Sequence, residues 1–166
     1  MDNNTIINTE DNISRLNGIG GWLILVIIGL SATIIKGIYS LLNFYYPLYS
    51  KGTLQALSAP SNKYYSPLWG PVITFEAVSG CIFILLAMSA LLLIFLKKKF
   101  LPKFMITLYL LNFIFSIIIY ILTLQLPTID GSTLVNSKGL INGVVTCSIW
   151  IPYFLRSERV KNTFIK

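Results

Sequence analysis

The sequence predicts an all-α membrane protein, a bundle of four transmembrane helices with both termini in the cytoplasm (N-in/C-in). Charged residues make up 11% of the 166 residues and hydrophobic residues 55%, whereas a soluble domain carries about 25% charged residues. Four long stretches contain no Asp, Glu, Lys or Arg, and most cationic residues gather on one side of these stretches. A surface so poor in charge needs an apolar solvent, which a bilayer provides.

The four uncharged stretches are long enough to cross a membrane, which takes about 20 mostly apolar residues. They cover residues 16–35, 77–96, 104–129 and 139–155. None of them alternates apolar and polar residues as a barrel strand does, and backbone groups in hydrocarbon must be hydrogen-bonded within a helix or a closed barrel. The stretches therefore predict helices at about 21–42, 71–96, 102–124 and 138–154.

Charges and prolines set the expected boundaries of these helices. The first helix continues past Lys36. The second begins at Pro71, because proline suits the first helical position, and it ends at the lysine cluster 97–99. The third begins near Pro102, and Pro152 kinks or ends the fourth.

One membrane domain follows from this division of the chain. A cytoplasmic tail (1–18) precedes the four-helix domain (19–155), and a basic cytoplasmic tail (156–166) follows it. Residues 43–70 form the main extracytoplasmic loop, which is rich in Tyr and Pro. We expect this loop to make any external contact.

The cationic residues decide the orientation. Nine of the thirteen Lys and Arg lie in the two tails or in the loop between the second and third helices. These nine are Arg15, Lys97, Lys98, Lys99, Lys103, Arg156, Arg159, Lys161 and Lys166. The opposite side holds three, namely Lys51, Lys63 and Lys138. Cytoplasmic loops carry the excess of Lys and Arg, so both termini are expected in the cytoplasm.

Aromatic and basic side chains mark the expected membrane interfaces. Amphipathic rings settle at headgroup level, and Trp22, Trp69, Trp150 and Tyr153 lie near the ends of predicted helices. Basic side chains near the surface gain about 1 kcal/mol each from anionic lipid. The residues expected to meet such headgroups, or alternatively a cytoplasmic partner, are Arg156, Arg159 and Lys161.

The residue inventory disfavours the common catalytic and cofactor sites. The chain has no histidine, so a serine–histidine pair, a zinc site of the HExxH type and a histidine-ligated haem are excluded. Aspartic catalysis needs paired carboxylates, and Glu76 is the only acid at membrane depth. Cys81 and Cys147 are expected to be free apolar thiols. We therefore expect no enzyme, no metal and no cofactor.

Two charges fall within predicted helices. Lys36 lies about 9 Å from the outer end of the first helix, and Glu76 about 7 Å from the outer end of the second, at 1.5 Å per residue. A charge at mid-bilayer costs roughly 2.5–3.5 kcal/mol. The matching depths suggest an intramembrane pair between Lys36 and Glu76. Independent snorkelling of each side chain to water and a functional ion or proton site are the alternatives.

Several segments resemble one bacterial inner-membrane family. The C-terminal stretch IWIPYFLRSERVKNTF (149–164), the GGWL opening of the first helix (20–23), the Phe-Glu pair (75–76) and the Phe-Leu-Pro turn (100–102) each resemble a signature of the family catalogued as domain of unknown function 2569. The resemblance spans residues 18–164. It implies a four-helix inner-membrane protein and no known activity.

A small bundle with short soluble parts and no catalytic set predicts a non-enzymatic accessory or interaction protein of the bacterial inner membrane. Its expected partners are the lipid bilayer, another membrane protein or a second copy. Nucleic acid is not expected, because the orientation rule accounts for the net charge of +7. One alternative is a small transporter or channel subunit with a polar path lined by Glu76, Lys36, Asn112 and Asn142. Another is an immunity-type protein against a membrane-active toxin.

Overall fold

The structure is a computed structural model that describes residues 20–127 and 137–164, and these residues contain helices and no strand. Four helices are long: α2 (Trp22–Ser40), α5 (Trp69–Phe95), α6 (Leu101–Thr123) and α7 (Ser137–Arg156). Four are short: η1 (Leu41–Tyr45), α3 (Tyr46–Ser50), α4 (Thr53–Leu57) and α8 (Glu158–Thr163). The long helices α5, α6 and α7 begin and end within two residues of the bounds expected from the sequence.

The first helix is longer than expected. Helices α2, η1 and α3 form one continuous helical stretch, Trp22–Ser50, which extends eight residues into the segment predicted as a loop. A proline inside a helix removes an N–H and clashes with the carbonyl four residues back. Here the π-helical turn η1 ends two residues before Pro47, and the Tyr46 N–H donates to the Leu41 carbonyl across the widened turn. The chain therefore accommodates the proline without leaving the helix.

The turn between α5 and α6 is tight. Lys97 has a φ of 50°, a left-handed conformation that usually falls to glycine after a helix. The Lys98 N–H donates to the Leu93 carbonyl over 3.2 Å, and the Lys97 N–H donates to the Ile94 carbonyl over 3.1 Å. These bonds satisfy carbonyls at the end of α5 and reverse the chain, so that α6 begins at Leu101.

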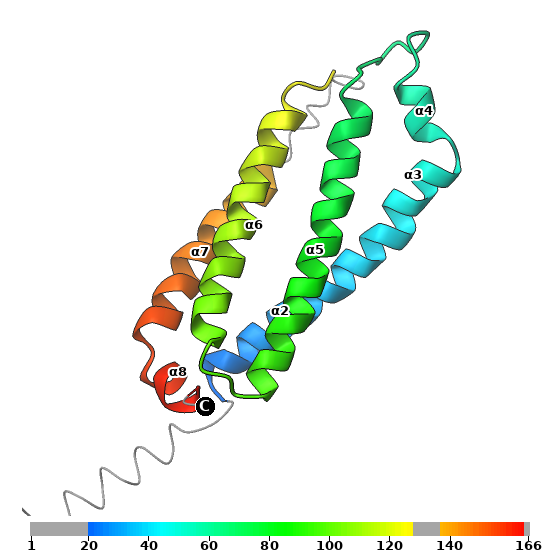
Figure 1. Ribbon diagram of the computed structural model, residues 1–166. Coiled ribbons are helices and arrows are strands. Elements are labelled where there is room, and N and C mark those ends of the chain that lie inside the picture. Colours follow the sequence, from blue (N-terminus) through cyan, green and yellow to red (C-terminus); the bar gives the residue numbers. More distant parts are fainter. Residues whose placement is uncertain (1–19, 128–136, 165–166) are drawn as a thin grey trace, which may run out of the picture.

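The long helices run alternately up and down (Figure 1). The first turn of α2, the α5–α6 turn and α8 lie together at one end, called here the tail end, and α4 lies at the opposite loop end (Figure 1). The principal contacts join α2 to α5, α5 to α6 and α6 to α7, the last being the most extensive.

Most of the core lies toward the tail end. Eleven buried residues from five helices, together with Phe164 after α8, form its largest cluster. They are Leu23, Val26, Leu30, Ala87, Ala90, Ile94, Leu101, Met105, Leu108, Phe154, Val160 and Phe164. A smaller cluster of Leu54, Trp69 and Ile73 closes the loop end.

Large apolar side chains cover the outside of the bundle. Ile35, Leu85 and Leu92 are 68%, 64% and 63% exposed, which hydrocarbon tolerates and water does not. Among the described residues, three helical stretches are long and apolar enough to cross a membrane: Trp22–Ser50, Trp69–Phe95 and Leu101–Thr123. These stretches indicate a membrane protein.

Candidate intramembrane binding site

Three adjoining cavities follow the face between α2–η1 and α6. Their volumes are about 260 Å³ nearest the tail end, 250 Å³ in the middle and 420 Å³ nearest the loop end. The first and second share Thr33, Phe83 and Asn112 as lining residues. The second and third share three other lining residues, namely Glu76, Ser116 and Ile119. The three cavities therefore adjoin one another along the bundle, and together they are called the cleft below.

The helix contacts explain why the cleft exists. Helix α2 packs chiefly on α5, and α7 on α6, which leaves a groove between α2 and α6. At Gly37 a β-carbon would lie 2.7 Å from Ile84 Cγ1, so only glycine lets α2 approach α5 this closely. The groove closes at the tail end, where the Trp22 and Trp150 rings meet edge to face with centroids 6.3 Å apart.

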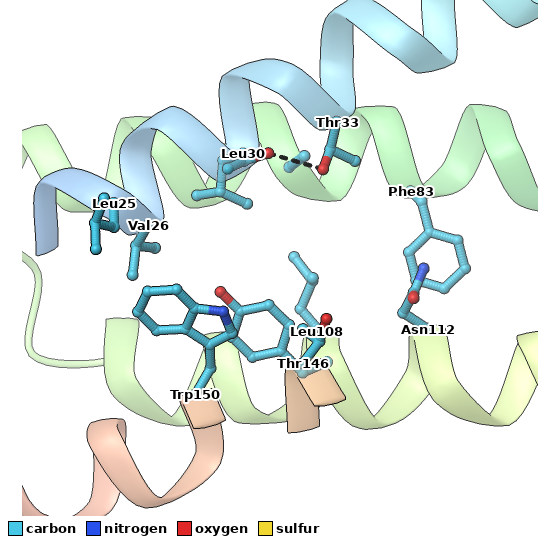
Figure 2. A pocket seen from close by; sticks show the side chains of 12 residues that line it. Leu25, Val26, Leu30, Thr33, Phe83, Leu108, Asn112, Thr146 and Trp150 are labelled. Carbon is cyan, nitrogen blue, oxygen red and sulfur yellow. Dashed lines mark hydrogen bonds between the residues drawn. The ribbon is translucent and has the colours of Figure 1, made fainter. Parts of the chain in front are cut away.

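Figure 2 shows the cavity nearest the tail end. Leu25 and Val26 project from α2 on one side, and Thr146 and Trp150 project from α7 on the other (Figure 2). Thr33 donates its hydroxyl proton to the Gly29 carbonyl over 2.8 Å. This cavity is therefore mainly apolar, with a few hydroxyl and amide groups on its walls.

Glu76 and Tyr45 form the centre of the middle cavity, called the Glu76 cavity below. Glu76 projects from α5 and is half-buried. The Tyr45 side chain, from η1, lies close to the Glu76 carboxylate and lines the same cavity. Among the residues that line this cavity, Glu76 alone carries a formal charge.

Two hydroxyl groups of the Glu76 cavity already have backbone partners. The Ser79 hydroxyl donates to the Glu76 carbonyl over 2.9 Å, and the Ser116 hydroxyl donates to the Asn112 carbonyl over 2.9 Å. These bonds leave the hydroxyl oxygens free to accept from a ligand. The cavity therefore offers one carboxylate and several acceptor oxygens.

Three aromatic rings complete the wall of the Glu76 cavity: Tyr45, Phe83 and Phe115. Phe83 meets Phe115 edge to face with centroids 5.4 Å apart. Phe75 stacks on Phe115 with centroids 5.5 Å apart and an interplanar angle of 4°. Such contacts hold the Phe115 ring in place.

The π-helical segment positions Tyr45. A π turn contains one extra residue, so side chains beyond it are shifted around the helix, and such turns are frequent at functional sites. Here η1 ends at Tyr45, the residue that reaches Glu76. Sequence reasoning missed Tyr45, because nothing in the residue pattern distinguishes a π turn from an α turn.

The structure does not place Lys36 against Glu76, so the predicted pair is not formed, and in the part of the chain that the structure describes no ion pair joins the two. Lys36 is exposed and lines a separate surface depression with Tyr39 and Asn43. Equal depth does not bring two side chains together, because contact also depends on rotation around each helix. Successive helical residues are about 100° apart, and Gly37, not Lys36, faces the cleft.

The predicted aromatic anchors have different environments. Trp22 is 59% exposed at the tail end. Trp150 contacts Trp22 and packs edge to face against Tyr153 at 5.8 Å. Trp69 is 6% exposed, and its Nε1–H donates to the Tyr64 carbonyl over 2.9 Å. Trp69 therefore packs inside the protein and not toward headgroups, which corrects the prediction for this residue.

The basic tail folds back onto the start of α2. Ser157 caps α8, since its hydroxyl accepts from the Val160 N–H over 3.4 Å, and Val160 is buried in the core. The Arg159 guanidinium lies over Gly20 and Gly21, where a β-carbon on Gly20 would collide with Arg159 Nη1. Gly21 has a φ of 57°, which favours glycine.

This contact, called the clasp below, joins two segments that are far apart in the sequence. Arg159 is half-buried in it, whereas Arg156 and Lys161 are exposed. Only Arg156 and Lys161 therefore remain as free basic side chains among the three predicted. The double glycine of the GGWL segment was the one sequence signal for a close approach.

The comparisons with known proteins give one result. A model of the family described as protein of unknown function (DUF2569) matches residues 16–165. No curated protein and no solved structure matches the chain.

Proposed function

We propose, from the premise that the chain belongs to the DUF2569 family of proteins of unknown function, that it is a four-span inner-membrane protein that binds a ligand in the cleft. The observation that carries the proposal is the run of three adjoining cavities with Glu76 at its middle. A close-packed bundle leaves few voids larger than a water molecule. A cleft of this size with one carboxylate is suited to a ligand.

The fourth span of the proposal is α7. It is less apolar than the other three long helices because Lys138, Asn142 and Thr146 lie in it. Its 20 residues rise about 30 Å, the thickness of the hydrocarbon core. Helix α7 also packs along α6 more extensively than any other pair of elements, which supports a shared span.

The charges support an orientation with the tail end in the cytoplasm. The tail end carries the lysine cluster 97–99 together with Arg156, Arg159 and Lys161, and the loop end carries Lys51 and Lys63. The excess of Lys and Arg is expected on the cytoplasmic side. A phosphatase or fluorescent reporter fused after Lys166 should report the cytoplasm, and the same reporter inserted after Ser61 should report the periplasm. The opposite pattern would refute the orientation.

The cleft supports one form of the broader accessory or interaction role, namely ligand binding without catalysis. General acid–base chemistry and nucleophilic catalysis each need a second reactive group held against the first. Beside Glu76 the cleft offers hydroxyl, amide and aromatic groups. We therefore propose that Glu76 binds a ligand and transfers no group.

Cysteine accessibility tests whether the cleft admits water and ligand. In a background with Cys81→Ser and Cys147→Ser, the variant Ser116→Cys places a thiol in the cleft, and Ile118→Cys places one on the apolar exterior of the same helix. The thiolate is the reactive form, and it needs water. A small membrane-impermeant thiol reagent should therefore modify Ser116→Cys at least about tenfold faster than Ile118→Cys.

Equal and slow modification of the two variants would refute the binding cleft. Thr33→Cys is a second cleft position on the facing helix, and it should also be modified. If Thr33→Cys is modified and Ser116→Cys is not, the cleft is open and the failure is local to residue 116. If neither is modified, the cleft is closed.

A small transporter or channel subunit is the second candidate. The observation that favours it is the succession of adjoining cavities from Trp150 near the tail end to Trp69 at the loop end. Glu76 would lie on this path, and Lys36 would not. Purified protein in liposomes should then conduct or exchange cations, and Glu76→Gln should abolish that flux. Absence of flux in the wild type would exclude this candidate.

A further inference from the structure

We propose that the Glu76 cavity binds an organic ammonium group. The inference rests on the proposed binding function and names the class of ligand. Three observations carry it: the charge of the cavity, its aromatic walls and its shape.

The charge of the cavity selects a cation. Glu76 supplies the one formal charge among the lining residues. Lys36 lies on a different face of α2 and lines a separate depression. A charge attracts an opposite charge far more strongly in a low-dielectric site than in water. An anionic ligand would meet only the carboxylate, which would repel it.

The aromatic walls select an organic cation. Tyr45, Phe83 and Phe115 line the cavity together with Glu76. Ring faces attract ammonium groups, and aromatic cages bind quaternary ammonium ligands in this way. Phe75 stacks on Phe115 and holds that ring against the cavity. The same rings are poor ligands for a bare metal ion, which requires about six oxygens.

The shape of the cavity fits an ammonium with apolar substituents. Aliphatic side chains of Leu41, Ile84 and Ile119 line the remainder of the 250 Å³. These surfaces gain nothing from a hydrated inorganic ion, but they pack against methyl or methylene groups. The acceptor oxygens of Ser79 and Ser116 can take N–H donors from a primary amine.

The ligand has a route from the loop end. Glu76 lies seven residues after Trp69, about 10 Å along α5 at 1.5 Å per residue. Glu76 also lines the 420 Å³ cavity that extends to Trp69 and Leu126 at the loop end. In the proposed orientation this depth is just below the outer headgroups. The ammonium can therefore come from a phosphatidylethanolamine headgroup or from a free amine.

Protection from modification tests the proposal with named probes. The Ser116→Cys protein, in the background without native cysteines, is reconstituted into vesicles of phosphatidylglycerol alone. Ethylammonium and tetramethylammonium are then titrated against the rate of thiol modification at constant ionic strength, with sodium as the reference. We expect the amines to slow modification in a saturable way and sodium to have little effect. Replacing half of the lipid with phosphatidylethanolamine tests the lipid source.

Variants assign the protection to named residues. Glu76→Gln should raise the half-protective amine concentration at least about tenfold, and Phe115→Leu should raise it by a smaller factor. The matched control is Glu158→Gln, an exposed acid on α8, which should leave it unchanged. If Glu76→Gln fails to fold, Phe115→Leu and Tyr45→Phe test the same site with the charge retained.

Each outcome has a defined meaning. Protection by phosphatidylethanolamine alone identifies a lipid headgroup, and protection by free amines identifies a soluble ligand. Modification that neither source slows, or that sodium slows equally, overturns the ammonium site and leaves the binding cleft standing. A thiol at residue 116 that is never modified overturns the cleft, and the ammonium site with it.

Discussion

Replacing Gly37 with alanine should separate α2 from α5 at the level of the cleft. A β-carbon on Gly37 would lie 2.7 Å from Ile84 Cγ1 and 2.8 Å from Ile84 Cδ1. Overpacking of this kind costs about 1–3 kcal/mol. Alanine in a helix interior recovers roughly 0.5–1 kcal/mol of that relative to glycine. The net expectation is a loss of about 1 kcal/mol of unfolding free energy, within a range of about 0–2.5 kcal/mol.

Gly29→Ala is the matched control on the same helix. No atom outside the local backbone lies within 4 Å of a β-carbon at Gly29, so only the gain in helix propensity remains. Unfolding of both variants and the wild type is followed in mild detergent by circular dichroism against a denaturing detergent. Gly29→Ala should be at least as stable as the wild type and Gly37→Ala less stable. A Gly37→Ala protein as stable as Gly29→Ala would refute the close α2–α5 contact.

Three further predictions concern other close contacts. Gly143→Ala should destabilise the α6–α7 pair by about 1 kcal/mol after the gain in helix propensity, because its β-carbon would lie 2.7 Å from Phe113 Cδ2. Detergent unfolding measures the loss. Gly20→Ala and Arg159→Ala should each loosen the clasp and lower the unfolding free energy. The double variant should lose less than the sum of the two single losses, with a coupling of about 0.5–3 kcal/mol. Strict additivity in this double-mutant cycle would contradict the contact. Lys97→Gly should stabilise the protein by about 1 kcal/mol, because a left-handed residue other than glycine costs about 1–2 kcal/mol; a lower unfolding midpoint would contradict that turn.

The positions of the long helices follow from the sequence because the membrane excludes charge. Uncharged stretches and the lysine cluster at 97–99 place α5, α6 and α7 within two residues. The end of the first helix does not follow from the same rule. Residues 37–50 are uncharged, but Pro47 suggests a break, and the π turn η1 that accommodates it leaves no mark in the pattern.

The candidate site is only partly visible in the sequence. Glu76 stands out as a charge at membrane depth. Its partner does not, because depth depends on the rise along a helix whereas contact depends on rotation around it. Lys36 matches Glu76 in depth and faces away from it, and Tyr45 reaches Glu76 only through the π turn.

The clasp shows a second limit. Gly20 and Gly21 indicate a close approach, but the sequence does not say of what. The answer is Arg159, almost the length of the chain away. Both segments resemble parts of one family pattern, and their contact at the tail end gives a structural reason for the two to occur together.

The charge preference of the cleft is the most direct test of the account. Two small thiol reagents of similar size, one carrying a trimethylammonium group and the other a sulfonate, are compared on Ser116→Cys in vesicles. We predict that the cationic reagent reacts at least about tenfold faster than the anionic one, after correction for their rates with a free thiol, and that Glu76→Gln removes the difference. Equal corrected rates in the presence of Glu76 would contradict a cation-binding site in the cleft.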